Sequence, residues 1–220
     1  MSAIFVAGTD TGVGKTLVTG LLAHYFIGRG KSVVTQKWIA TGGAHDIKVH
    51  SEIAGLTDME RRDHIVPYSF KLAASPHLAA RCERKTINTG KIKKSFAALS
   101  KLYDLVIVEG TGGLLVPVGG KGLLIDIVKD LAIPTLLVAR NRIGAINHTL
   151  LSIEALKARR IPIIGIVFNN LSKTKKVILD DNQKTVEKIS GVPVLGQLPG
   201  SHSIRTLLGG FKAIGDRIDL

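Results

Sequence analysis

Short apolar segments alternate with longer amphipathic segments along most of the chain. Their length and their β-branched residues predict buried strands. Between them, segments such as HTLLSIEALKARR at 148–160 repeat apolar residues at helical spacing. The alternation predicts an α/β fold, a mostly parallel sheet flanked by helices on both faces, with ligands at the carboxyl ends of the strands. Besides AIFVAG at 3–8, the predicted strands are SVVTQKW, YDLVIVEG, PTLLVAR, IPIIGIVFN and VPVLGQLP, which begin at residues 32, 103, 134, 161 and 192.

The pattern is least regular between residues 41 and 101, where we expect an enlarged crossover that carries substrate-specific elements. A chain of 220 residues with 45% hydrophobic content can bury one sizeable core, and its composition shows no break, so we expect a single domain over 1–220. We also expect a cytoplasmic protein, because the N-terminus lacks the features of a signal peptide and no apolar run is long enough to cross a bilayer. Cys82 is the one cysteine, which excludes a disulfide within the chain, and we expect its thiol to be buried.

The stretch GTDTGVGKT, residues 8–16, lies between the first predicted strand and a helical pattern that ends near Gly28. Its glycines allow successive backbone N–H groups to line a concave site for an anion, at the start of a helix. Lys15 adds a point charge for the outer phosphates of a nucleotide, and Thr16 can place its hydroxyl on a magnesium ion. The loop is a variant, because five residues rather than four separate Gly8 from Gly14. A tight turn would explain the glycines alone, but it would not require Lys followed by Thr.

Three other strand ends carry polar side chains, and the predicted fold brings them near this loop. Glu109 follows four apolar strand residues, so its burial would be costly without a cation, which suggests a magnesium role. A carboxylate bonded to a helix N-terminus is the alternative. Lys37 could stabilise a phosphoryl group in transfer, or it could be a solvated strand end. Asn169 and Asn170 end a third strand.

Taken together, these motifs resemble those of the dethiobiotin synthetase family, ATP-dependent enzymes of biotin biosynthesis with a P-loop NTPase-like fold. The resemblance extends from residue 8 to residue 200, and the motifs occur in the family's order. GTDTGVGKT resembles the phosphate loop of the family and QKWIATG its lysine-containing strand. The further matching segments are VPYSF, SPHLAA, VIVEGTGG, GAINHTLLSIEAL, VFNN and LGQLPG.

The resemblance implies a ligase that forms C–N bonds from 7,8-diaminopelargonic acid, CO2 and ATP. The diamine would take up CO2 as a carbamate, and ATP would phosphorylate the carbamate to a carbamic-phosphoric anhydride. The second amine would then close the ring, giving dethiobiotin, ADP and phosphate. The resemblance also implies a homodimer whose substrate site lies at the subunit interface.

The resemblance implies a role for each matching residue. Lys37, Lys15 and Thr11 would be catalytic, and Thr16, Asp46 and Glu109 would bind Mg²⁺. A cap of the following helix would also explain Asp46, and Glu52 is a competing second acidic ligand. The substrate would contact Thr41 and, on the opposite subunit, Gly144, Ala145, Ile146 and Asn147. The nucleotide-binding residues would be Gly12, Val13, Gly14, Lys15, Thr16, Leu17, Asp46, Glu109, Gly112, Asn169, Pro199, Gly200 and Ser201, with the base recognised by the segments VFNN and LGQLPG.

A formal net charge of +13 raises the alternative of a partitioning or septum-positioning ATPase that binds DNA or a membrane. Such ATPases usually place a second Lys early in the loop, where this chain has Asp10. Aromatic residues make up only 5% of the chain, which argues against stacking on single-stranded nucleic acid. We therefore expect neither nucleic acid nor membrane as a partner. A related amide-forming ATPase with another substrate is a second alternative.

Overall fold

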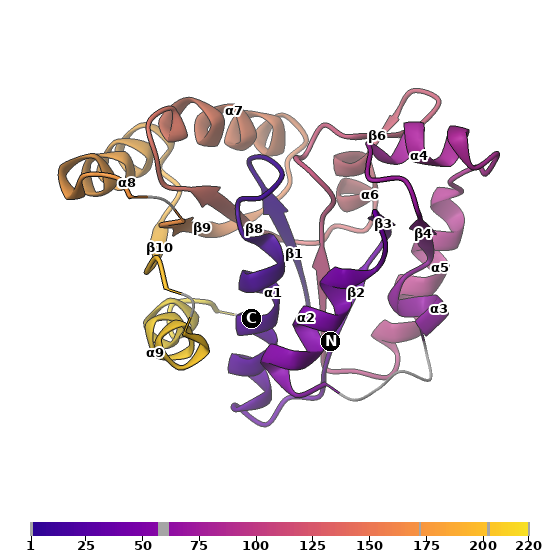
Figure 1. Cartoon of the computed structure of the whole chain (residues 1–220), viewed down its shortest axis with the longest axis horizontal. Helices are drawn as coiled ribbons and strands as arrows, with labels where there is room; N and C mark the ends of the chain where they lie inside the picture. Colours follow the sequence, from indigo (N-terminus) through magenta and orange to yellow (C-terminus); the bar gives the residue numbers. More distant parts are fainter. Residues whose placement is uncertain (1, 57–61, 172, 202, 220) are drawn as a thin grey trace.

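The computed structural model describes residues 2–56, 62–171, 173–201 and 203–219. Within these residues a parallel six-stranded sheet has the order β10-β9-β8-β1-β5-β2, which confirms the predicted α/β fold (Figure 1). Each predicted strand contributes one strand to it, shorter by a few residues in most cases. The bounds are β1 (Ser2–Gly8), β2 (Val33–Lys37), β5 (Leu105–Glu109), β8 (Thr135–Arg140), β9 (Ile163–Asn169) and β10 (Val194–Leu198).

Helices cover both faces of this sheet, as the alternating pattern predicts. Along β1, Ile4 and Val6 pack with α1 (Lys15–Ile27) and α9 (Ile204–Gly215). Phe5 and Ala7 point to the opposite face, because successive strand side chains alternate. The cluster on that face includes residues of α3 (Arg62–Ile65), α4 (Pro76–Cys82), α5 (Thr89–Ser100), α6 (Leu124–Asp130), α7 (Ala145–Ala158) and α8 (Lys176–Ser190). The remaining helix, α2 (His45–Ala54), packs on α1.

The segment between β2 and β5 is an enlarged crossover, but it holds more regular structure than its sequence suggested. It contains α2 to α5 and a small parallel pair, β3 (Ile39–Thr41) with β4 (Tyr68–Phe70). Several of these elements are three to seven residues long, too short for a periodic pattern to be recognised. Trp38, Phe70 and Ile92 join the core and attach the crossover to the sheet. A further antiparallel pair joins β6 (Pro117–Gly119) and β7 (Gly122–Leu123).

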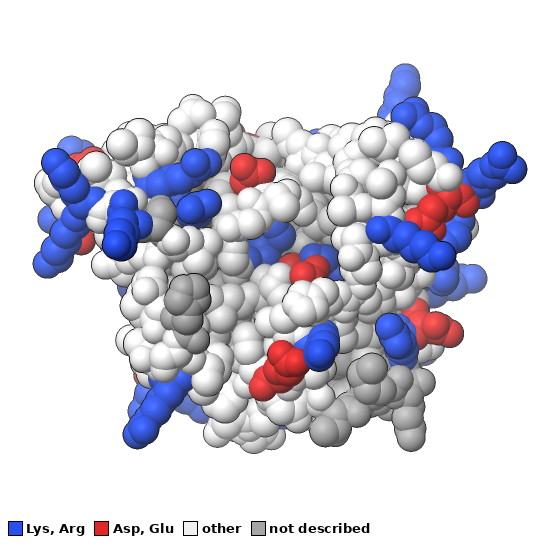
Figure 2. All heavy atoms as spheres, in the orientation of Figure 1, with Lys and Arg blue, Asp and Glu red and all other residues white. Residues whose placement is uncertain are grey.

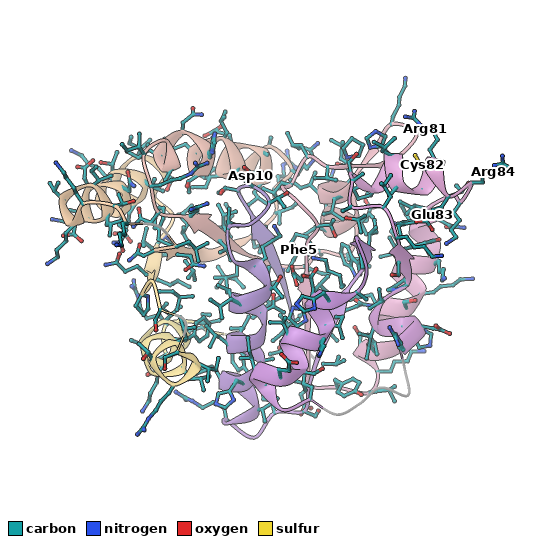
Figure 3. The ribbon with its side chains drawn as sticks, in the orientation of Figure 1. Phe5, Asp10, Arg81, Cys82, Glu83 and Arg84 are labelled. Atoms are coloured by element: carbon teal, nitrogen blue, oxygen red, sulfur yellow. The ribbon has the colours of Figure 1, made fainter. Side chains whose placement is uncertain are left out.

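The prediction of a buried Cys82 is wrong, because its side chain is exposed at the end of α4. The buried face of this helix consists of Pro76, Ala79 and Ala80, and helical spacing leaves Cys82 off that face. Figure 3 shows Cys82 with Arg81 on the outer side of the helix. Among the described residues, no helix combines the length and the apolar character that a membrane span requires.

Parallel pairing brings the strand ends that carry polar residues to one edge of the sheet. Lys37, the last residue of β2, lies beside Glu109, the last residue of β5, and Glu109 in turn lies beside Val6 of β1. The loop that follows β1 rises over the same edge (Figure 1). The fold therefore gathers the loop and both charged side chains in one region.

Candidate active site

The loop between β1 and α1 has the backbone conformation that its glycines allow. Gly12 and Gly14 have φ angles of 69° and 99°, which side chains with a Cβ rarely adopt. A Cβ on Gly14 would also lie 2.0 Å from Asn169 Nδ2, so the space excludes any larger residue. Lys15 Nζ donates to the carbonyl of Asp10 at 2.9 Å, across the loop. Figure 3 shows Asp10 at the tip of this loop.

Lys15 is buried, and its environment changes its acidity. Burial and, to a smaller extent, the positive charge of Lys37 together lower the pKa of Lys15 to about 8, against the opposing effect of nearby carboxylates. An anionic ligand strongly stabilises the charged form of an ammonium group that has lost much of its hydration and lies near a second cation. The loop therefore favours a phosphate beside Lys15.

Lys37 and Glu109 form a buried ion pair at the ends of β2 and β5. Lys37 Nζ lies 2.7 Å from Glu109 Oε1 and donates to the carbonyl of Gly110 at 3.0 Å. Burial alone would raise the pKa of Glu109, but the charge of Lys37 and the hydrogen bond from His50 outweigh it and lower the pKa to about 2. Glu109 is therefore an ionised carboxylate across the physiological range. Lys37 is not a solvated strand end.

Asp46 joins this pair from the first turn of α2. Its Oδ2 lies 2.8 Å from Lys37 Nζ, and Thr16 Oγ1 lies 3.1 Å from both Asp46 Oδ1 and Glu109 Oε1. The helix is capped at Ala44, so Asp46 does not act as its N-cap. The competing Glu52 has a side chain that is 61% exposed and lies 3.7 Å from Lys48. The structure thus brings Asp46, and not Glu52, to Thr16 and Glu109.

The oxygens of Thr16, Asp46 and Glu109 suit a magnesium ion. Hydroxyl and carboxylate oxygens are the donors that Mg²⁺ prefers, and the Lys37 ammonium already lies between the two carboxylates. In the part of the chain that the structure describes, no group of three His, Cys, Asp or Glu residues could hold a metal ion. With only two carboxylates and one hydroxyl, we expect the ion to need nucleotide phosphates as further ligands.

A cavity of about 800 Å³ lies over this cluster. Figure 2 shows the hollow near the centre of the viewed face, where positive and negative side chains lie below the surface. Its wall includes Ala73 to Pro76 of the crossover, part of which belongs to the SPHLAA segment. The predicted site residues that line it are Thr11, Gly12, Gly14, Lys15, Thr16, Lys37, Thr41, Asp46, Glu109 and Gly112.

The predicted base-recognition residues lie outside the lining of this cavity. Asn169 is completely buried, and its Nδ2 donates to the carbonyl of Val13 at 3.1 Å. Its Oδ1 has no hydrogen-bond partner among the described residues. Pro199, Gly200 and Ser201 follow β10. Gly200 packs closely on the backbone of Asn170, because a Cβ at position 200 would lie only 2.4 Å from the carbonyl oxygen of Asn170. The half-buried Leu17 continues α1 after Thr16.

The start of α7 lies on the other side of the phosphate loop from the cavity. Ala145 is buried and, with Asp10, Thr11 and Arg140, lines a separate space of about 30 Å³. Asn147 is exposed, Ile146 is half-buried and Gly144 adopts a left-handed conformation before the helix. None of these four predicted substrate residues lines the large cavity of its own chain.

His50 is a residue of the site that sequence reasoning missed. Its ring is completely buried, and its Nε2 lies 2.8 Å from Glu109 Oε2. The available signal was its position four residues after Asp46, which places both side chains on one face of a helix. The apolar pattern of this short segment did not distinguish a buried histidine from a surface one.

Comparisons with known proteins support the assignment of a nucleotide-binding loop and of the α/β fold. A protein-family model described as an AAA domain matches residues 2–206. The septum site-determining protein MinD of Pyrococcus horikoshii, solved in complex with Mg-ADP, has a similar fold, with a TM-score of 0.65 and 15% identity over 98% of this chain and 94% of that chain. The fold and the site define the chain as a P-loop nucleotide-binding protein.

Curated relatives identify the family within this class of proteins. The ATP-dependent dethiobiotin synthetase BioD of Halalkalibacterium halodurans is 38% identical over 216 residues, which span 96% of this chain and 89% of the relative. The enzyme of the same name from Chlorobaculum tepidum is 42% identical over 187 residues, or 82% of this chain and 78% of the relative. The chain belongs to the ATP-dependent dethiobiotin synthetase family, which confirms the resemblance of the motifs.

Proposed function

We propose that this protein is an ATP-dependent ligase that makes dethiobiotin from 7,8-diaminopelargonic acid and CO2. One observation carries the proposal: two buried lysines and two carboxylates meet beside the phosphate loop at the base of one large cavity. A carbamate and the phosphates of ATP are all anions, so they approach one another only in a cationic enclosure. Membership in the family supports the identity of the substrates.

The reaction needs two anions to be held together while a phosphoryl group moves. One substrate amine adds to CO2 and loses a proton to give the carbamate, and a carbamate oxygen then takes the γ-phosphoryl group from ATP, releasing ADP. The second amine attacks the carbamate carbon, closes the ring and expels phosphate. Lys15 and the loop amides bind the outer phosphates, and Lys37 stabilises charge on the carbamate and the transferred group.

Magnesium would be held by Thr16, Asp46 and Glu109 together with the nucleotide. When bound, the ion would neutralise part of the charge on the outer phosphates. The geometry favours Asp46 over Glu52 as the second acidic ligand, because only Asp46 lies beside Thr16. The unpartnered Oδ1 of Asn169 suits the exocyclic amine of adenine, and the neighbouring Pro199, Gly200 and Ser201 would cover the base.

A homodimer would complete the substrate site. Residues 144–147 lie outside the cavity of their own chain, and a helix start suits a carboxylate through its unpaired N–H groups and its dipole. Exposed apolar side chains lie on this helix and next to it: Leu151 of the helix is 61% exposed, Ile143 just before it 79%, and Leu115 beside it 54%. A second copy would bury them. The single domain, the cytoplasmic location and the absence of nucleic-acid or membrane partners stay predictions.

ATP turnover should require both diaminopelargonic acid and a source of CO2, because the phosphoryl acceptor must be built on the enzyme. The measurement is ADP release with each component omitted in turn, alongside formation of dethiobiotin. Duplex DNA in place of the two substrates is the control for the partitioning-ATPase alternative and should give no stimulation. Full turnover without the diamine would contradict the proposal.

Affinity for ATP should fall as pH rises above about 8. Below this pH Lys15 is charged, and above it the free protein loses the proton that phosphate binding must recover. The dissociation constant should therefore rise by up to about tenfold per pH unit between pH 8 and 9.5, measured by calorimetry. Lys15→Arg is the matched control, because a guanidinium stays charged and its affinity should be nearly independent of pH. An equally steep fall in that variant would assign the effect to another group.

A further inference from the structure

Glu109 uses its two carboxylate oxygens for different neighbours. Oε1 faces the phosphate loop and Lys37, at 3.1 Å from Thr16 Oγ1 and 2.7 Å from Lys37 Nζ. Oε2 faces α2 and lies 2.8 Å from His50 Nε2. Since an ionised carboxylate only accepts hydrogen bonds, Nε2 must donate, in either the neutral or the charged ring. His50 therefore holds one oxygen and leaves the other toward the site.

His50 and Glu109 meet in a buried environment that offers the His50 ring no other hydrogen-bond partner among the described residues. Both side chains are fully buried, and His50 Nδ1 has no hydrogen-bond partner among the described residues. Within the described part of the chain, the contact with Glu109 is thus the one hydrogen bond that this ring makes. The same helix carries Asp46 one turn earlier, so the contact also ties the helix that bears Asp46 to the end of β5.

We propose that His50 is a positioning residue for the magnesium site: it holds Oε2 so that Glu109 presents Oε1 alone, beside Thr16 and Asp46. The inference rests on the proposed function, which assigns magnesium to these oxygens. Groups that hydrogen-bond to metal ligands typically contribute 10- to 100-fold in metal affinity, because they fix the orientation of the ligand.

His50 also sets which cation the site prefers. Mg²⁺ demands near-ideal octahedral geometry at short distances, whereas Ca²⁺ accepts both oxygens of one carboxylate in a looser shell. With Oε2 held by His50, Glu109 cannot offer both oxygens to one ion. Removal of the ring would free Oε2 and relax this restriction, so it should weaken Mg²⁺ binding more than Ca²⁺ binding.

The test is calorimetric titration of ADP into the full-length protein at several concentrations of Mg²⁺ or Ca²⁺. His50→Leu should weaken Mg²⁺ binding to the ADP complex by at least about tenfold and Ca²⁺ binding by less than about threefold. ADP affinity without metal should not change. His50→Gln keeps a donor that can reach Oε2 and should bind both ions within about threefold of wild type. His45→Leu, at an exposed position of the same helix, is the matched control.

Two results would overturn the inference. Unchanged Mg²⁺ affinity in His50→Leu would show that the ring does not position Glu109, and an equal loss for both ions would reduce it to a packing role. Both leave the proposed function intact as long as the wild type responds to Mg²⁺. A wild-type protein whose ADP affinity ignores both ions would instead contradict the magnesium assignment and this inference together. If His50→Leu does not fold, His50→Met carries the same expectations.

Discussion

Replacing Lys37 with alanine should lower kcat by at least about a hundredfold, while the affinity for ATP stays near that of the wild type. Lys37 Nζ is buried between Glu109 and Asp46 at the base of the cavity, where no other described ammonium group except that of Lys15 lines the wall. In the proposed reaction, charge on the carbamate and phosphoryl oxygens develops there, so the loss of this cation should raise the barrier. Lys15 and the loop amides, which we propose as the phosphate ligands, would remain in place. Steady-state kinetics and ATP titration separate the two effects.

Stability must be measured with this variant, because Lys37 pairs with a buried carboxylate. Removal of one partner of such a pair can cost about 3 kcal/mol or more in the free energy of unfolding. Thermal unfolding in the presence of ADP and Mg²⁺ shows whether the assayed protein is folded, and Lys37→Met preserves more of the side-chain volume. Lys48→Ala on the exposed face of α2 is the matched control and should keep full activity. Turnover within a few-fold of wild type in Lys37→Ala would remove Lys37 from the mechanism.

Two inactive variants should restore activity when they are combined, because the proposed site takes residues from both subunits. Lys15→Ala removes the phosphate cation from one half of the site. Asn147→Glu places a negative charge at the start of α7 and should lower kcat/KM by about a hundredfold through repulsion of the substrate carboxylate. In a mixed dimer, one of the two sites keeps both halves intact. Random pairing of equal amounts should therefore recover about one quarter of wild-type activity.

Position 147 suits this experiment better than position 145. Asn147 is exposed and accepts a longer side chain, whereas Ala145 is buried and its replacement would disturb the start of α7. Asn147→Gln is the control for size without charge and should stay active. If mixed dimers are shown to form and remain inactive, or if a monomeric form has full activity, the substrate carboxylate must be bound within one chain.

Local sequence was enough to predict the strands, the phosphate loop and the charged residues at the ends of two strands. Buried parallel strands are continuous apolar runs, and a loop with glycines before Lys15 and Thr16 has few other uses. Short elements of the crossover were not predictable, because α3, α4, β3 and β4 have too few residues for a period to appear. Their stability comes from contacts with the core, as for Ile39 of β3 and Phe70 of β4.

By itself, the sequence of this protein determined the fold class and the main groups at the phosphate loop, since these depend on local pattern and on strand ends that parallel pairing must bring together. The tertiary structure decided the choices that depend on which way a helix faces. It placed Asp46 rather than Glu52 against Thr16, and it buried His50 on Glu109. It also directed the amide of Asn169 to the carbonyl of Val13, far away in the chain. The orientation of α2 arises from packing on α1 and β2, which no local segment encodes.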